Sequence, residues 1–176
     1  AKDINNSMKD IYKNWDSKLY FSYLKEFDLP ENKPLKSMSK GMRKKLEIVT
    51  AISHKSKLLI LDEPTSALDP VVRAEVLEVL QKFIEDEEHS ILLSTHITSD
   101  LERIADEIIF IDKGKKVLQK SRDEIIDNYG ILKCDIDYFS NIDKKDIIAY
   151  KKTKYAYEVL VNDKKQASKK YHNCVI

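Results

Sequence analysis

The feature that most constrains the fold is a short apolar run that ends in two carboxylates. Residues 58–61 read Leu-Leu-Ile-Leu and are bounded on both sides by polar residues. Such a run is typical of a strand buried on both faces, as in a parallel sheet. Asp62 and Glu63 follow it directly. Ligands of open α/β sheets bind just beyond the carboxyl ends of the strands, so we expect a site here.

The remaining pattern alternates helices with strands. The periodicity of apolar residues predicts two helices within residues 4–27, a third from Ser39, and a fourth that begins at Asp69-Pro70. Residues 90–94 and 108–111 read as further strands, and 112–115 as a hairpin turn. Residues 99–102 have the spacing of a capping box. This order indicates a layered α/β core followed, after a helix at 121–128, by short strands.

Composition excludes several classes of protein. The chain has 31 basic and 30 acidic residues, a net charge of +1, which argues against a dedicated nucleic-acid binder. No apolar stretch is long enough to cross a bilayer, and the N-terminus has no secretory signal pattern. Cys134 and Cys174 lack metal-like spacing, which favours reduced thiols in a cytosolic protein.

Polar residues that could take part in a reaction follow two of the predicted strands. Asp62 could help to hold Mg²⁺, and Glu63 could polarise a water for attack on a γ-phosphate. His96 stands just after the predicted strand at residues 90–94. The alternative is that one strand simply reaches solvent at its carboxylates and that the histidine is incidental.

Two further segments could contact a nucleotide at helix N-termini. Ser39 and the Gly41 amide would lie at the start of a helix, which is a natural anion site; a plain serine cap beside a solvated Lys/Arg face is the alternative. Residues 66–69 read Ser-Ala-Leu-Asp, where Asp69 is an N-cap whatever else it does.

Taken together in this order, the four segments resemble the ATP-binding cassette family of ATPases. Residues 38–42, Met-Ser-Lys-Gly-Met, look like its signature motif, and residues 58–62 look like its Walker B strand. Glu63 falls at the catalytic glutamate, residues 66–69 at the D-loop, and His96 at the switch histidine. The resemblance covers roughly residues 1–128.

The resemblance implies a fold and a division of the chain. The fold class would be α/β: part of a P-loop ATPase-type layered core, with a helical subdomain and a small β-containing C-terminal segment. Residues 1–50 would form the signature-containing helical subdomain, residues 51–129 the second half of the core, and residues 130–176 the appended segment.

The resemblance also implies ligands, partners and roles. ATP and Mg²⁺ would be the cofactors, with Asp62 toward the metal and with Glu63 and His96 as the catalytic residues. Transmembrane permease subunits and a second ATP-binding subunit, arranged head to tail, would be the partners, with no nucleic acid. The protein would lie in the cytoplasm, on the inner face of the membrane through its permease. The residues implied in nucleotide contact are Ser39, Lys40, Gly41, Met42, Ser66 and Asp69.

Two departures from the family pattern matter. Lys40 stands where the usual signature has its first glycine, and Met42 stands at the glutamine, while Ser39 and Gly41 are retained. No Gly-x-x-x-x-Gly-Lys-Ser/Thr loop occurs, and the chain has three glycines. We therefore expect the protein to continue upstream of Ala1 and expect no ATPase activity from this chain alone. Exposed strand edges should also make it self-associate.

Three other readings share some of these motifs. Chromosome-maintenance and DNA-repair ATPases carry the same signature, acidic pair and histidine, but place a long coiled coil before the signature. Twin-cassette translation factors usually add basic linkers and a second cassette. A truncated regulatory module would bind without catalysis and would not need Glu63 or His96. The sequence upstream of Ala1 would separate these readings.

Overall fold

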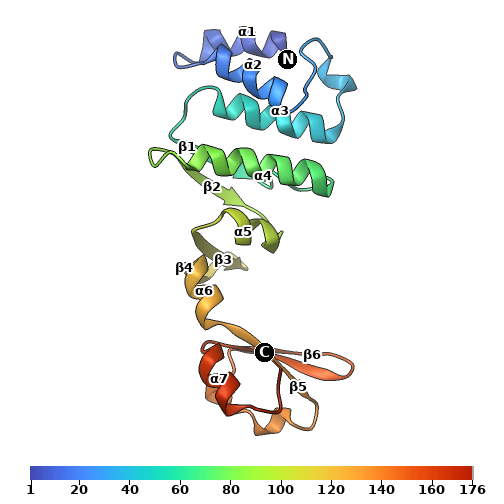
Figure 1. The fold of residues 1–176 in the computed structure, drawn as a ribbon, viewed down its shortest axis with the longest axis vertical. Coiled ribbons are helices and arrows are strands. Elements are labelled where there is room, and N and C mark those ends of the chain that lie inside the picture. Colours follow the sequence, from blue (N-terminus) through green and yellow to red (C-terminus); the bar gives the residue numbers. More distant parts are fainter. Residues whose placement is uncertain (176) are drawn as a thin grey trace. The chain divides into compact units, whose positions relative to one another are not determined.

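The computed structural model describes residues 1–175 and divides into two compact units, residues 1–104 and 105–176 (Figure 1). It is a mixed α/β structure, as the sequence predicted. The predicted three-part division at residues 50 and 129 stays a prediction. Among the described residues, no helix has both the length and the apolar character that a membrane span requires.

The helices of the first unit begin where the sequence provides capping side chains. The Asp16 carboxylate accepts hydrogen bonds from the Leu19 and Lys18 amides, and the Asp69 carboxylate does the same at the fourth helix. The predicted helices are confirmed: α1 (Lys2–Ile11), α2 (Ser17–Glu26), α3 (Lys40–Ile52), α4 (Pro70–Ile84) and α5 (Thr98–Ile104), with a short 3₁₀ turn at Leu35–Ser37.

The two strands of the first unit form a parallel pair. β1 (Leu58–Asp62) and β2 (Ser90–Ser94) are joined by α4, and their register pairs Asp62 with Ser94. Both are extended, as predicted. The expectation of burial on both faces was wrong, however: Leu59 is 3% exposed, whereas Ile60 is 72% exposed. The reason is that α4 packs on one face of the pair, where Leu59 joins the apolar core, while no described residue buries Ile60 and Leu92 on the other face.

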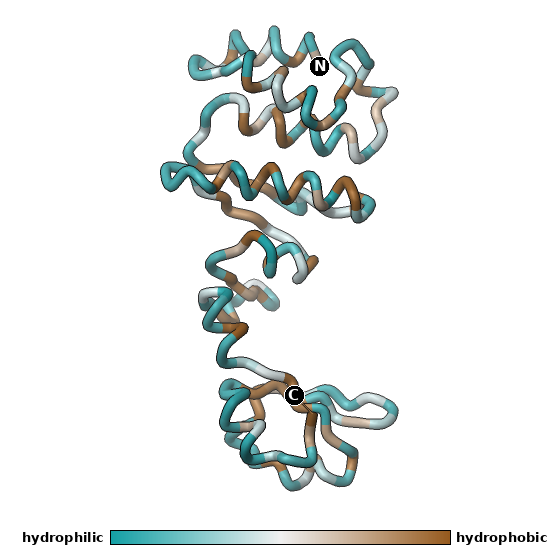
Figure 2. Tube along the Cα trace, in the orientation of Figure 1, coloured by the Kyte–Doolittle hydropathy of each residue, from teal (hydrophilic) through white to brown (hydrophobic). Residues whose placement is uncertain are grey.

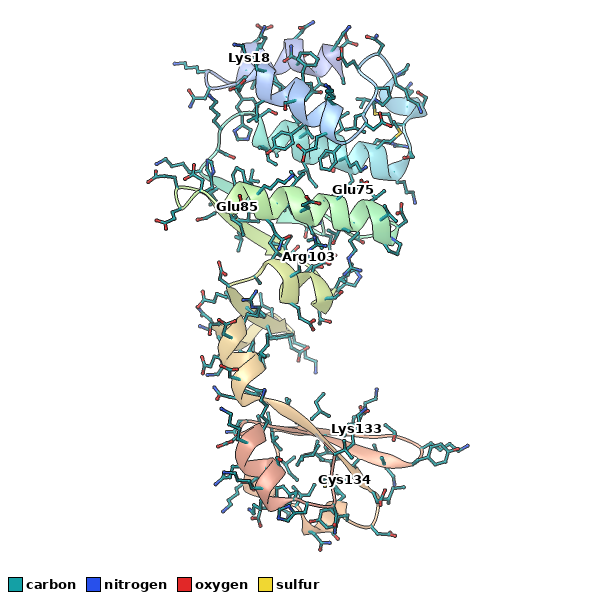
Figure 3. The ribbon with its side chains drawn as sticks, viewed as in Figure 1. Lys18, Glu75, Glu85, Arg103, Lys133 and Cys134 are labelled. Atoms are coloured by element: carbon teal, nitrogen blue, oxygen red, sulfur yellow. The ribbon has the colours of Figure 1, made fainter. Side chains whose placement is uncertain are left out.

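The core of this unit lies between α2, α3 and α4, which carry most of its apolar residues (Figure 2). Its fully buried side chains come from all three helices: Tyr20, Leu24, Val49, Val76 and Leu80. An ion pair between Lys45 and Glu75, the latter labelled in Figure 3, joins α3 to α4. The Lys45 ammonium also lies 5.2 Å from the centroid of the Phe27 ring. This packing fixes the start of α3 against α4.

The second unit begins with the predicted hairpin. β3 (Glu107–Asp112) and β4 (Lys115–Ser121) pair antiparallel and form a sheet of their own. Lys113 and Gly114 both have positive φ, 48° and 74°. A tight turn between twisted strands requires this backbone conformation, and glycine adopts it without strain. α6 (Arg122–Asn128) follows, capped by the Ser121 hydroxyl, which accepts from the Glu124 amide.

The predicted C-terminal strands form an antiparallel sheet in the order β5-β7-β6. Their bounds are β5 (Gly130–Asp135), β6 (Ala149–Lys152) and β7 (Ala156–Val161). α7 (Lys164–Lys170), which the sequence pattern did not predict, packs on this sheet through Ala167. Lys133 and Cys134 point to opposite faces of β5 (Figure 3), so that Lys133 is exposed while Cys134 is buried.

The uncovered face of the β1–β2 pair predicts self-association. Ile60 and Leu92, on that face, are 72% and 58% exposed. Replacing both with threonine should keep the strands extended, because threonine is β-branched, while removing apolar surface. We expect sedimentation velocity to show oligomers of the parent chain and a shift toward monomer in the double variant. Val71→Thr, at an exposed position on α4, is the matched control. An unchanged oligomer in the double variant would contradict the prediction.

The Cys174 thiol should be unreactive in the folded chain. Burial and the neighbouring Cys134 thiol raise the pKa of Cys174 to about 12, well above the ordinary range of a thiol. Since the thiolate is the nucleophile, alkylation near pH ~8 should be about 10²–10³-fold slower in the folded chain than in denaturant. Iodoacetamide labelling followed by mass spectrometry measures both rates. Cys134→Ser removes one cause of the raised pKa and should speed the reaction. Equal rates with and without denaturant would contradict the assignment.

Candidate active site

The parallel register brings two strand ends together. β1 ends at Asp62 and β2 at Ser94, directly opposite each other. The Ser94 hydroxyl donates a hydrogen bond to Asp62 Oδ1. The Glu63 amide donates to the Ser94 carbonyl at 3.0 Å, which continues the ladder by one residue. The sequence assigned no role to Ser94; pairing the two apolar runs in parallel with their ends aligned would have placed it opposite Asp62.

Glu63 and His96 are in direct contact. His96 Nδ1 lies 2.8 Å from Glu63 Oε1, and the imidazole is largely exposed, with 71% of its side chain accessible. Glu63 Oε2 is buried, and no group in the described part of the chain hydrogen-bonds to it. A carboxylate that acts as a general base must keep an oxygen for the proton that it accepts. His96 therefore holds the Glu63 carboxylate through Oε1, and Oε2 is left without a partner but closed to solvent.

The loop after β1 has a strained backbone. Glu63 and Ala67 both have positive φ, 46° and 57°. This region costs residues other than glycine on the order of 1–2 kcal/mol each. Such strain persists only where the surrounding structure enforces it, and it occurs often at functional sites. Here it turns the chain sharply, directly after the last strand residue, and carries the Glu63 side chain toward His96.

A buried polar network holds this loop against α5. Asp100 is 1% exposed. It accepts hydrogen bonds from the Thr65 hydroxyl at 2.5 Å and from Arg73 Nε at 2.6 Å. Charge-assisted bonds of this kind are among the stronger ones in proteins. Because Thr65 follows the acidic pair by two residues, the network fixes the position from which Glu63 is presented.

This network also corrects the predicted capping box. α5 begins at Thr98, so Ser99 lies inside the helix, and its hydroxyl accepts a hydrogen bond from Arg73 at 2.6 Å. Ser99 and Asp100 thus bind an arginine of α4, and this tertiary contact prevails over local capping. This network could not have been predicted from the sequence, because its hydrogen-bonding residues come from three separate segments whose spacing along the chain matches no known motif.

The predicted signature residues form a second group at the start of α3. Ser39 caps the helix, and its hydroxyl accepts from the Met42 amide at 3.1 Å. A Cβ at Gly41 would lie 3.4 Å from a methyl carbon of Val72, which is an ordinary van der Waals distance, so Gly41 faces α4 at close range. Lys40 is exposed. A shallow groove of about 240 Å³ separates this helix from the loop at residues 66–68 and is lined by Lys40, Arg43, Lys44, Glu47, Ser66, Ala67 and Leu68.

The two groups remain separate within one chain. Among the described residues, no hydrogen bond or ion pair joins residues 39–42 to Asp62, Glu63 or His96. Asp69 serves as the N-cap of α4, and Ser66 lines the groove of the signature group. The structure therefore offers an acidic cluster with a histidine, and apart from it a helix N-terminus beside a basic groove. The roles assigned to all of these residues stay predictions.

The acidic cluster fits a magnesium ion that is held mainly by other ligands. Within residues 1–175, no group of three or more His, Cys, Asp or Glu side chains could hold a metal by itself. Mg²⁺ typically binds through one or two carboxylates and keeps waters and phosphate oxygens as its other ligands. Asp62, with the Ser94 hydroxyl beside it, could supply the one carboxylate ligand that such a Mg²⁺ site takes from the protein.

A family model and the names of curated relatives together give the affiliation of the chain. The model described as "AAA domain, putative AbiEii toxin, Type IV TA system" matches residues 6–99, more than half of the 176 residues. Curated relatives of the chain are named as a lantibiotic transport ATP-binding protein and as an ABC transporter ATP-binding protein. The chain belongs to the ATP-binding cassette ATPases. The resemblance on which the sequence analysis rested is thereby confirmed.

Individual relatives show how this ATP-binding cassette chain compares with known ones. It is 42% identical to the lantibiotic transport ATP-binding protein SrtF of Streptococcus pyogenes, over 53% of this chain and 40% of that protein. It is 27% identical to the ABC transporter ATP-binding protein YtrB of Bacillus subtilis, over 73% of this chain and 44% of that protein. The chain thus spans less than half the length of these curated relatives.

Solved structures share the cassette fold. The cassette MJ0796, described as a dimer in a post-hydrolysis state bound to ADP and Pi, matches with a TM-score of 0.52 and 22% identity, over 57% of this chain and 44% of that one. The cassette MJ1267 matches with a TM-score of 0.54 and 18% identity, over 62% and 44%. At these identities the likeness concerns the fold alone. The predicted P-loop ATPase-type α/β fold is confirmed.

The buried network should govern the stability of the first unit. Thr65→Val removes the hydroxyl that donates to Asp100 Oδ2, and leaving a buried acceptor without its donor costs about 1–3 kcal/mol. Trp15 is the only tryptophan of the chain and lies in this unit, so its fluorescence in a urea titration reports the unfolding free energy. Thr98→Val, at an exposed position of α5, should change it by less than about 0.5 kcal/mol. Equal effects of the two variants would contradict the role of the network.

Proposed function

We propose that this chain is part of the ATP-hydrolysing subunit of an ABC transporter, which couples ATP binding and hydrolysis to transport by membrane subunits. The observation that carries the proposal is the contact of 2.8 Å between Glu63 and His96, beside Asp62 at the aligned ends of two parallel strands. The relatives named above are transport proteins, which favours transport over DNA maintenance, translation or a non-enzymatic regulatory role.

In this proposal the acidic cluster performs the chemistry on one nucleotide. Glu63 accepts a proton from the attacking water through Oε2, which is buried in this structure and would have to become open to water when nucleotide binds. His96 holds the other oxygen and thereby orients the carboxylate. Asp62, fixed by Ser94, takes part in binding Mg²⁺; when bound, the ion neutralises charge on the phosphate oxygens. Phosphoryl transfer depends mainly on positioning and charge, so the loss of Glu63 should be severe.

The signature group serves the nucleotide of a second subunit. Ser39 and the amides at the start of α3 would contact the γ-phosphate held by the partner in a head-to-tail dimer, because the helix N-terminus attracts anions. The absence of a direct hydrogen bond or ion pair between the two groups, among the described residues, is consistent with this division of labour. Lys40 is exposed at that end and would add positive charge where the usual signature has glycine. Ser66 and Asp69, on the loop beside the groove, would complete the contact.

The remaining partners follow from the same proposal. Transmembrane permease subunits would bind the helical subdomain and hold the protein on the cytoplasmic face of the membrane. Tyr12 is 41% exposed and stacks on His54 at 4.7 Å between ring centroids, which supports it as a candidate contact. Tyr20 is fully buried in the helical core, so that we assign it to packing.

The test uses a chimeric cassette in which the phosphate-loop half of a related ATP-binding protein precedes this chain. We expect Glu63→Gln to lower the ATP turnover number at least about 100-fold while ATP affinity stays within a few-fold, because the amide cannot accept the proton. Phosphate release and a fluorescent nucleotide titration measure the two quantities. Glu85→Gln, at an exposed site at the end of α4, is the control. The 176-residue chain alone should show no release above background.

Near-normal turnover by Glu63→Gln, with the parent chimera active, would refute the assignment of the catalytic base. Loss of turnover in the Glu85→Gln control would show that the chimera reports folding rather than chemistry. Release of phosphate by the chain alone that depends on Glu63 would contradict the expectation that a phosphate loop is required.

A further inference from the structure

A basic hairpin with exposed aromatic and aliphatic side chains projects from the C-terminal sheet. It comprises residues 148–157, at the junction of β6 and β7, and we call it the basic hairpin. Lys151, Lys152 and Lys154 are exposed, and no acidic residue occurs between Asp146 and Glu158. Its backbone trace is hydrophilic toward the turn (Figure 2).

The apolar part of the basic hairpin is also exposed. Tyr155 is 74% exposed, Tyr150 60% and Ile148 49%. β6 is an edge strand of the sheet, and lysines on an edge strand also prevent pairing with other chains. That protective role needs no exposed tyrosine or isoleucine, so the combination requires another explanation.

The aromatic rings give the basic hairpin a firm base. Phe139 and Tyr157 stack with their centroids 4.0 Å apart, and Tyr150 packs against Phe139 at 5.0 Å. Lys152 Nζ lies 5.6 Å from the centroid of Tyr157. Cation–π contacts of this kind place the ammonium groups beside the aromatic side chains. Positive charge and apolar surface are thus held together on one element.

Charge is distributed unevenly along the chain. Residues 130–176 contain ten lysines and six acidic residues, whereas residues 1–129 contain 21 basic and 24 acidic residues. The net charges are therefore +4 and −3, which sum to the +1 of the whole chain. An anionic surface would attract the C-terminal segment and repel the rest of the chain, so that the C-terminal segment would face the surface when the two approach.

We propose that the basic hairpin docks on an anionic phospholipid surface. The lysines would pair with lipid headgroups, while Tyr150, Tyr155 and Ile148 would enter the boundary between headgroups and acyl chains, where amphipathic rings are favoured. The proposal rests on the proposed function, because a transporter subunit works beside a membrane. It assigns a role to the C-terminal segment, which takes no part in the proposed nucleotide chemistry.

Single-stranded nucleic acid is the rival ligand, since lysines and tyrosines also bind stacked bases. The observations disfavour it. The Phe139 and Tyr157 faces are occupied by each other, and Lys154 lies 5.0 Å from the centroid of Tyr155. An exposed isoleucine gives no stacking surface, whereas it does favour insertion into a lipid boundary.

The experiment measures binding of the full 176-residue chain to vesicles by co-sedimentation. We expect binding to phosphatidylcholine vesicles that contain about 30% phosphatidylserine, little binding to pure phosphatidylcholine, and loss of binding at high salt. The triple variant Lys151→Gln, Lys152→Gln, Lys154→Gln should lower the partition coefficient on the order of 100-fold, since each lysine near such a surface contributes roughly a factor of five. Tyr155→Ser should weaken the binding further.

The matched control removes the same charge elsewhere. Lys115, Lys165 and Lys169 are exposed lysines of the second unit outside the basic hairpin, and their triple glutamine variant should change binding only a few-fold. Circular dichroism confirms that each variant is folded. Equal losses in the two triple variants would overturn the proposal, because the attraction would then be diffuse. Binding to a single-stranded oligonucleotide that depends on the basic hairpin, without binding to vesicles, would also overturn it.

The two proposals can fail independently. The vesicle assay uses no nucleotide, so Glu63→Gln should bind vesicles as the parent chain does. Absent vesicle binding together with the expected loss of turnover in the Glu63→Gln chimera would overturn the docking proposal alone.

Discussion

The candidate site depends on the parallel pairing of β1 with β2. This register sets Asp62 opposite Ser94 and carries the ladder on to the Glu63 amide. From there the chain turns through a left-handed backbone at Glu63, so that the carboxylate meets His96. A shift of one residue would send each of these side chains to the opposite face of the sheet. Every proposed catalytic role therefore rests on a backbone interaction.

Two other interactions keep this arrangement in place. The Thr65–Asp100–Arg73 network ties the loop after β1 to α4 and α5, which compensates for the strain at Glu63. The close approach of Gly41 to Val72 seats the signature helix beside the loop at residues 66–68. The first interaction orients the acidic cluster and the second positions the helix N-terminus. Both act through α4, which makes this helix the common support of the two groups.

The local features of the fold could be predicted because short-range chemistry decides them. Capping by Ser39 and Asp69, the extended run at residues 58–61, and the turn at Lys113 and Gly114 each follow from neighbouring residues. Two expectations failed where distant residues decide. Ser99 binds Arg73 of α4 instead of capping its helix, and Ile60 is exposed because no described residue covers it.

The sequence by itself determined which elements form and which residues stand at their ends, because propensity, capping and the order of motifs are properties of the chain. It thereby determined the family and the candidate residues. Only the tertiary structure decided that Glu63 contacts His96 with one oxygen, that Asp100 is the buried centre of a network, and that the C-terminal lysines and tyrosines gather on one hairpin. These outcomes depend on register, packing and burial between residues far apart in sequence, which no local pattern encodes.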